Sequence, residues 1–147
     1  MKKTYLAIAE GKFSNKQGLI TAPLGRDRKN YKRIVVDTVT GREAVTEYTV
    51  LNSTEKYTLL ELRPRTGRTH QIRVHLNAIG HSLCGDPVYF PPELHRTYLF
   101  PRVMLHAWKI SFVHPKKHQP VEYTAPIAED MRKVINDLEL NTVNLTF

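Results

Sequence analysis

The stretch RTGRTHQIRVHLNAIG, residues 65–80, combines a periodic apolar pattern with a cluster of basic side chains. Its apolar residues recur at intervals of four and three, which is the pattern of a helix with one buried face. These residues are Ile72, Leu76 and Ile79. Because Gly80 is a typical helix stop, the pattern predicts a helix over residues 69–79. On a helical wheel Arg73 lies at the border of the buried stripe, where its guanidinium can point into a cleft.

Segments rich in β-branched and aromatic residues surround this helix and predict strands. The expected strands cover residues 4–10, 34–39, 43–51, 57–64, 104–114 and 121–125. Alternation along the strand at 104–114 predicts one shared face for four of its residues. They are His106, Trp108, Ile110 and Phe112. A second helix is expected at 127–139, and the proline-rich segment 90–101 is expected to be a loop.

These elements predict an α+β fold. The expected architecture is a mostly antiparallel β-sheet with two main helices, in a single domain over residues 1–147.

The chain is strongly basic for its length. It has 22 Lys and Arg residues against 14 Asp and Glu residues, a net charge of +8 and a pI near 9.7. This imbalance favours a polyanionic partner, most often nucleic acid, although a basic enzyme with another substrate stays open. No apolar run reaches the ~20 residues of a membrane span, so no membrane partner is expected. The single cysteine, Cys84, excludes an internal disulfide and a cysteine-based zinc site and indicates a cytoplasmic location.

One expected loop carries a dense basic cluster with an aromatic residue in it. The cluster consists of Arg28, Lys29, Tyr31, Lys32 and Arg33. Such side chains can contact phosphates and stack on a base of RNA, and the alternative is a solvated loop. The start of the predicted helix, next to Arg68, adds free backbone N–H groups that favour an anion.

Other chemistry is less well supported by the sequence. His70 and His75 are five residues apart, whereas helical metal-binding pairs are four apart, so their side chains diverge and no metal is expected. Cys84 has no neighbour that would activate it and is expected in the core or a loop. Asp86 belongs to a Gly-Asp-Pro sequence, which favours a turn or capping role over a catalytic one.

The segment TGRTHQIRVHLNAIGHSLCGDPVY, residues 66–89, resembles the signature of the RluA-type pseudouridine synthases. These enzymes isomerise uridine to pseudouridine in ribosomal or transfer RNA, without a metal or organic cofactor. The resemblance extends from YLAIAEG at residues 5–11 to YTAPIAEDM at 123–131. It implies that Tyr5 is the active-site tyrosine that stacks on the target base. It also implies that Arg73 pairs with the catalytic aspartate and that Leu83 lines the base pocket.

The family's catalytic aspartate lies in an HRLD motif, and no HRLD occurs in these 147 residues. We therefore expect the C-terminal part of a catalytic domain that is inactive alone. The alternative is a non-catalytic RNA-binding module of the same ancestry. Without its aspartate, Arg73 is expected to turn to solvent, take another carboxylate or bind an anion. Unpaired sheet edges are expected to favour dimers.

Overall fold

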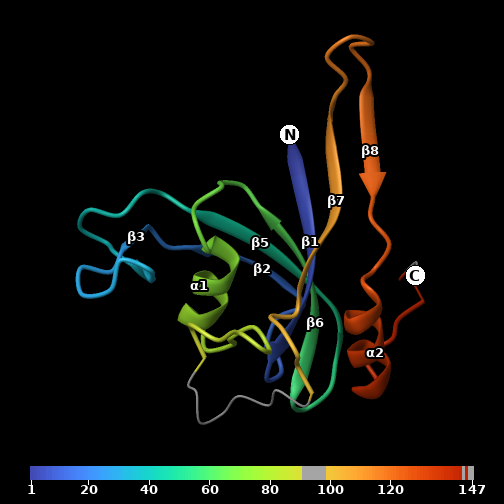
Figure 1. The fold of residues 1–147 in the computed structure, drawn as a ribbon, viewed down its shortest axis with the longest axis horizontal. Helices are drawn as coiled ribbons and strands as arrows, with labels where there is room; N and C mark the ends of the chain where they lie inside the picture. Colours follow the sequence, from blue (N-terminus) through green and yellow to red (C-terminus); the bar gives the residue numbers. More distant parts are fainter. Residues whose placement is uncertain (91–98, 144, 146–147) are drawn as a thin grey trace.

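The centre of the fold is a pair of buried antiparallel strands, β1 (Lys2–Glu10) and β6 (Tyr57–Pro64). The computed structural model describes residues 1–90, 99–143 and 145. In this part of the chain, six antiparallel strands form a sheet in the order β2-β5-β6-β1-β7-β8 (Figure 1). The outer strands are β2 (Gln17–Thr21), β5 (Val45–Ser53), β7 (Leu105–Val113) and β8 (Pro120–Thr124).

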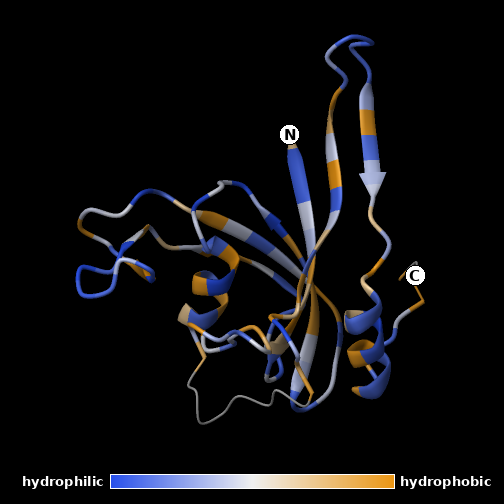
Figure 2. Cartoon of the chain, in the orientation of Figure 1, coloured by the Kyte–Doolittle hydropathy of each residue, from blue (hydrophilic) through white to orange (hydrophobic). Residues whose placement is uncertain are grey.

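Two helices, α1 (Gln71–Ala78) and α2 (Glu129–Asp137), pack on opposite faces of this sheet. Alternate side chains of β1 therefore enter two different cores. Ala7 and Ala9 face α1, whereas Leu6 and Ile8 face α2. All four side chains are fully buried. Figure 2 shows hydrophobic and hydrophilic segments alternating along both helices, as expected for helices with one buried face.

Neither helix is long or apolar enough to cross a membrane, and the same is true of every helix in the described residues.

A second, two-stranded sheet lies beside α1. It consists of β3 (Leu24–Arg26) and β4 (Ile34–Val36), and the basic loop connects them. A small apolar cluster fixes this hairpin to the helix. The cluster contains Leu24, Ile34, Ala44, Val74 and Tyr89.

The predicted α+β class, with a mostly antiparallel sheet and two main helices, is confirmed. The strand expected at 34–39 ends already at Val36, because the Asp37 carboxylate accepts N–H groups of the following turn. The first helix begins at Gln71, two residues later than predicted. His70 adopts a left-handed conformation with φ 55°, which a helix cannot include. Residues 91–98 of the expected loop lie outside the described residues.

The predicted end of α1 at Gly80 is confirmed. Gly80 has φ 85°, and its N–H donates to the Asn77 carbonyl at 3.0 Å. The N–H of His81 donates to the Leu76 carbonyl at 2.9 Å. This pair of hydrogen bonds is the Schellman arrangement that terminates helices at a glycine.

The prediction that four residues of the strand at 104–114 share one face is wrong, because β7 contains a bulge. Two neighbouring β1 residues, Thr4 and Tyr5, pair with β7 residues that are two apart, so Trp108 is an extra residue in β7. An extra residue of this kind interrupts the strict alternation of side chains. Sequence patterning cannot detect the bulge, since it depends on the register with β1.

Because of the bulge, even-numbered side chains at the two ends of β7 lie on opposite faces of the sheet. His106 lies opposite Leu6 and faces α2. Ile110 lies opposite Lys3, on the face that α1 covers further along the sheet, and Phe112 follows it on that face.

We expect Gly85→Ala to destabilise the fold by about 2–4 kcal/mol. Gly85 has φ 78°, and a Cβ there would lie 2.1 Å from the carbonyl oxygen of Arg102. Urea unfolding at neutral pH measures the change. Gly67→Ala is the matched control, since a Cβ at Gly67 meets nothing within 4 Å. It should leave stability unchanged or raise it by up to about 1 kcal/mol. Equal effects at both positions would contradict the steric explanation.

Candidate active site

A cleft of about 500 Å³ opens between the start of β1, the turn before α1 and the start of β7. Four basic side chains from these elements line it: Lys3, Arg65, Arg68 and Arg73. The other lining residues are Met1, Tyr5, Pro64, Thr66, Gly67, His70, Gln71, Ile72 and Leu105. Within the part of the chain that the structure describes, no carboxylate lines this cleft. The cleft is therefore electropositive and suited to an anionic ligand.

Tyr5 reaches the cleft from β1. It lies opposite Leu62 of β6 and Ala107 of β7, and its half-buried side chain packs against the core on the α1 side. Arg73 approaches from the start of α1, at the edge of the buried stripe, as predicted. The fold thus brings together two of the three residues that the sequence resemblance singles out. Their catalytic roles stay predictions.

Arg73 forms a two-point ion pair with Asp86. Its Nε donates to Oδ2 and its Nη2 to Oδ1, each at 2.9 Å. The Asp86 side chain is fully buried, and that of Arg73 is 17% exposed. Of the three outcomes expected for Arg73, the structure shows the second, an ion pair with another carboxylate. Removing one partner of such a pair leaves a buried charge without compensation.

Asp86 is also the turn residue that its Gly-Asp-Pro sequence predicts. Its Oδ1 accepts the backbone N–H groups of Val88 at 2.9 Å and Tyr89 at 3.1 Å. Burial alone raises the pKa of Asp86, but the hydrogen bonds from Arg73 and these two N–H groups outweigh it. The net pKa of Asp86 is therefore lowered. The hydrogen bond to Asp86 in turn raises the pKa of Arg73.

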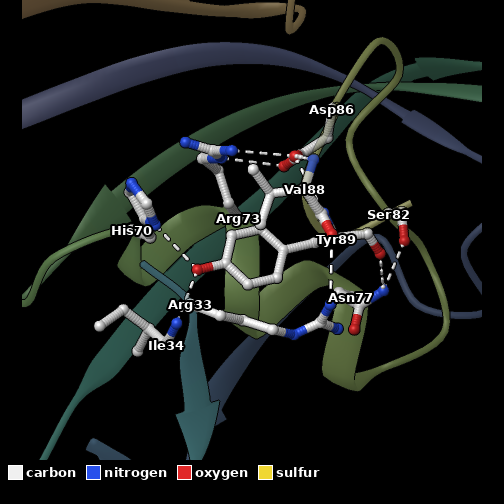
Figure 3. A network of polar contacts seen from close by, with 9 residues as sticks. All are labelled: Arg33, Ile34, His70, Arg73, Asn77, Ser82, Asp86, Val88 and Tyr89. Carbon is white, nitrogen blue, oxygen red and sulfur yellow. Dashed lines mark hydrogen bonds and ion pairs between the residues drawn. The ribbon is translucent and has the colours of Figure 1, made fainter. Parts of the chain in front are cut away.

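Tyr89 contacts several of the residues around Arg73 (Figure 3). Its ring lies between two guanidinium groups, with the Cζ of Arg33 at 5.3 Å and that of Arg73 at 5.2 Å from the ring centre. Its hydroxyl accepts the N–H of Ile34 at 2.9 Å and shares a 2.8 Å hydrogen bond with Nδ1 of His70. Burial, followed by the charge of Arg73, lowers the pKa of His70 and favours its neutral form.

Gln71 fixes the turn that forms one wall of the cleft. Its side-chain carbonyl accepts the Thr66 hydroxyl at 2.7 Å and the Arg68 N–H at 3.0 Å. Its amide donates to the carbonyl of Val45 at 2.9 Å and to the hydroxyl of Thr46 at 3.0 Å. All four hydrogen-bonding positions of this buried amide are used, so the motif TGRTHQ is rigid where it borders the cleft.

His75 is held inside the fold by two hydrogen bonds. It is fully buried, its Nε2 lies 2.9 Å from the carbonyl of Ala22, and its Nδ1 lies 2.8 Å from the hydroxyl of Thr46. Since a carbonyl only accepts, Nε2 carries the proton and Nδ1 accepts from the threonine. Burial lowers the pKa of His75, which keeps the ring neutral.

The structure does not bring the basic loop into the cleft. Arg28, Lys29, Tyr31 and Lys32 are exposed on the β3–β4 hairpin, and none of them lines the cleft. Arg33 differs, because it is half-buried and is held by Tyr89 and by a 3.3 Å hydrogen bond to the carbonyl of Val88.

Leu83, expected in the base pocket, is fully buried in the core on the α1 side and bridges Ala9. It is absent from the residues that line the cleft. Leu105 is the leucine at the cleft surface, and sequence reasoning missed it. It also missed Lys3, Gln71 and the pairing of Asp86 with Arg73. A helix pattern shows which face is buried, but these contacts join segments that only the fold brings together.

In the described residues, no three His, Cys, Asp or Glu side chains are close enough together to hold a metal ion. Cys84 is a buried core residue, as expected.

Comparisons with known proteins find relatives that match most of this chain. The sequence profile of the family described as RNA pseudouridylate synthase matches residues 1–78. A Bacillus subtilis (strain 168) protein named as the uncharacterized RNA pseudouridine synthase YlyB is 42% identical over 139 residues. That match covers 95% of this chain and 45% of the relative.

A second relative is the ribosomal large subunit pseudouridine synthase D of Nitrosomonas europaea. It is 40% identical, and the match covers 92% of this chain and 40% of the relative. The chain thus spans less than half the length of these relatives. The solved structure of human RNA pseudouridylate synthase domain containing 1 superposes with a TM-score of 0.74 at 27% identity. It covers 90% of this chain, and the chain covers 58% of it.

We expect Asp86→Asn to lower the free energy of unfolding by about 3–5 kcal/mol, because Arg73 loses its buried counter-ion. Asp130→Asn is the matched control. Asp130 also binds an arginine, Arg102, through two hydrogen bonds, but both side chains are more than a third exposed. Loss of this exposed ion pair should lower the free energy of unfolding by at most about 1 kcal/mol. Chemical unfolding at pH 7 compares the variants, and a larger effect at Asp130 would contradict the importance of burial.

The same pair predicts how acid acts on stability. Because the pKa of Asp86 is lower in the folded state than its unfolded value of 3.8, its contribution is complete above that value and is lost as the pH falls below it. The stability gap between the parent chain and Asp86→Asn should therefore narrow below about pH 4.

We expect His75→Gln to flatten the dependence of stability on pH between about 5 and 7. The unfolded chain binds a proton at His75 near pH 6.5, whereas the folded chain binds it only at lower pH. Stability of the parent chain therefore falls with decreasing pH, by up to about 1.4 kcal/mol per pH unit for one histidine. Unfolding curves across this range measure the slope. An unchanged slope in His75→Gln would refute the assignment.

Proposed function

Because the chain belongs to the RNA pseudouridylate synthase family, we propose that it carries the tyrosine and arginine half of a pseudouridine synthase active site. The activity that we propose for the complete enzyme is the isomerisation of uridine to pseudouridine in RNA. The observation that carries the proposal is the shared cleft. Tyr5 and Arg73 line one electropositive hollow, although they lie far apart in sequence and in different elements.

Each residue is suited to a separate part of this reaction. A base must leave the RNA stack before chemistry can occur on it, and the half-buried ring of Tyr5 offers a surface for the extruded uracil. The family resemblance implies that a carboxylate attacks or assists at C1′, so the bond from C1′ to N1 breaks. The uracil then rotates, and a bond forms from C1′ to C5 as any bond between C1′ and the carboxylate breaks. The C5 proton is lost and N1 takes up a proton, so the product is an isomer of uridine.

Arg73 is positioned to hold that carboxylate in its ionised form. Asp86 occupies Nε and Nη2, and within the described residues Nη1 has no hydrogen-bond partner. A carboxylate entering the cleft can therefore bind the remaining side of the same guanidinium. Asp86 cannot be the nucleophile, since both of its oxygens accept hydrogen bonds and it does not line the cleft.

We further propose that the RNA is ribosomal, with transfer RNA as the alternative, in a cytoplasmic setting. One relative is named for the large ribosomal subunit, and the exposed basic loop offers Arg28, Lys29 and Lys32 to the phosphates outside the cleft.

A second candidate function is RNA binding without catalysis. It is supported by one observation, the absence of a carboxylate from the described cleft lining. Under both proposals the 147-residue chain alone forms no pseudouridine, and they differ in what happens when a carboxylate is supplied.

The test uses the chain alone and the chain fused to the part of the Bacillus subtilis relative that lies outside the matched segment. Each is incubated with ribosomal RNA, and pseudouridine is mapped. We expect product only from the fused protein. In it, Arg73→Ala should lower turnover by at least about 100-fold while RNA affinity is largely kept. Arg102→Ala, at the exposed ion pair with Asp130, is the control that should stay active.

Product from the 147-residue chain alone would show that the nucleophile lies within it. An inactive fusion that still binds RNA supports the binding module instead. Full activity of Arg73→Ala would remove the role proposed for this arginine.

A further inference from the structure

His70 lines the cleft at the turn before α1, where its backbone is left-handed, with φ 55°. This conformation is costly for a residue with a side chain and persists where surrounding contacts enforce it. The contact here is with Tyr89. Nδ1 of His70 lies 2.8 Å from the Tyr89 hydroxyl, and the two rings meet edge to face with centres 5.6 Å apart. The imidazole is therefore held in one position at the wall of the cleft.

The Tyr89 hydroxyl decides which ring nitrogen of His70 carries the proton. This hydroxyl already accepts the N–H of Ile34 at 2.9 Å, and Tyr89 is only 4% exposed. Its own proton needs an acceptor, and in the described part of the chain Nδ1 of His70 is the one it has. A neutral imidazole that accepts at Nδ1 carries its proton on Nε2. The ring is neutral at pH 7, because burial, followed by the charge of Arg73, lowers the pKa of His70.

Nε2 of His70 is therefore an unused hydrogen-bond donor. It makes no hydrogen bond to any residue that the structure describes, and Figure 3 shows it on the side of the ring away from the Tyr89 hydroxyl. Among the described residues, only His106 and Trp108 have a buried side-chain nitrogen without a partner. Nε2 of His70 is thus open to the cleft that its side chain lines.

Arg68 adds further unused donors to the same wall. Its Nε donates to the carbonyl of Glu43 at 2.8 Å, which holds the guanidinium in place. Its two Nη groups have no partner within residues 1–90, 99–143 and 145, and Arg68 also lines the cleft. A neutral N–H beside a guanidinium, in a cleft whose described lining has no carboxylate, suits a phosphate oxygen.

We propose that the Nε2–H of His70 donates a hydrogen bond to a backbone phosphate of the RNA in the cleft, beside Arg68, and that Tyr89 is the residue that positions it. This inference rests on the proposed function and adds an RNA contact to the same site. The phosphate lies next to the extruded uridine, because Tyr5 lines the same cleft. A phosphate is favoured over a base edge, since the charged side chains of the described lining are all cationic.

Nitrogen-15 NMR of the His70 ring tests the orientation of the donor. In the 147-residue chain at pH 7 we expect Nδ1 to be unprotonated and Nε2 to carry the proton. A single-stranded oligouridylate should shift the Nε2 signal and leave that of Nδ1 nearly unchanged. A proton on Nδ1, or no shift of Nε2 at saturating RNA, overturns the inference. In Tyr89→Phe the preference for Nε2 should weaken, and an unchanged preference would remove the positioning role of Tyr89.

Two substitutions separate the two nitrogens of His70. The side-chain amide of asparagine lies as many bonds from Cβ as Nδ1, and that of glutamine as many as Nε2. His70→Asn keeps the contact with Tyr89 and suits a left-handed backbone, but it removes the donor in the cleft. His70→Gln keeps that donor. We expect His70→Asn to weaken oligouridylate binding at least about tenfold, and His70→Gln to retain most of the affinity.

His118→Asn is the matched control. His118 is also left-handed, with φ 52°, but it is exposed between β7 and β8 and does not line the cleft. It should leave RNA affinity unchanged. Binding is measured for the 147-residue chain and for the fused protein, and circular dichroism confirms that every variant folds.

Two comparisons identify the phosphate. A neutral donor releases no counter-ion, so His70→Asn should leave the dependence of affinity on salt unchanged, whereas Arg68→Ala should make its logarithmic slope shallower by about 0.7. The loss in His70→Asn should be equal for oligouridylate and oligoadenylate, because their phosphates are the same.

Four results overturn the inference: parent-like affinity in His70→Asn, equal losses in His70→Asn and His70→Gln, a shallower salt slope in His70→Asn, or a loss confined to oligouridylate. An equal loss in His118→Asn does so as well. If RNA binding behaves as expected but the fused protein forms no pseudouridine, the phosphate contact stands and the proposed function is contradicted.

Discussion

The ion pair of Arg73 with Asp86 connects the first helix to the turn at residues 85–89 and thereby organises one side of the cleft. It buries a full negative charge, which is tolerated only because a guanidinium and two backbone N–H groups surround it. The same contact orients the guanidinium so that one side remains for a further anion. The chain thus pairs the arginine proposed for catalysis with a carboxylate that has no part in the proposed reaction.

Two polar residues of α1 are held by hydrogen bonds within the fold, and one of them, Gln71, also lines the cleft. Gln71 uses all its hydrogen-bonding positions within the fold, and His75 is fully buried between Thr46 and Ala22. Such a fully satisfied network holds the wall of the cleft in one conformation, because any rotation would leave a buried polar group without a partner. The cations Lys3, Arg65 and Arg68 are then displayed on a rigid surface. A preorganised site of this kind avoids the cost of ordering when an anionic ligand binds.

Much of this protein follows from local pattern. The α+β class, the strand at 57–64, the stop at Gly80 and the border position of Arg73 depend on periodicity and turn chemistry, which act between near neighbours in the chain. The motif at 66–89 is also specific enough to indicate the family by itself. Three features depended on the tertiary structure: the left-handed His70, the bulge at Trp108 and the pairing of Arg73 with Asp86. Each of these features depends on a contact between segments distant in sequence or on the register of two strands. The residue pattern of a single segment encodes neither such contacts nor the register.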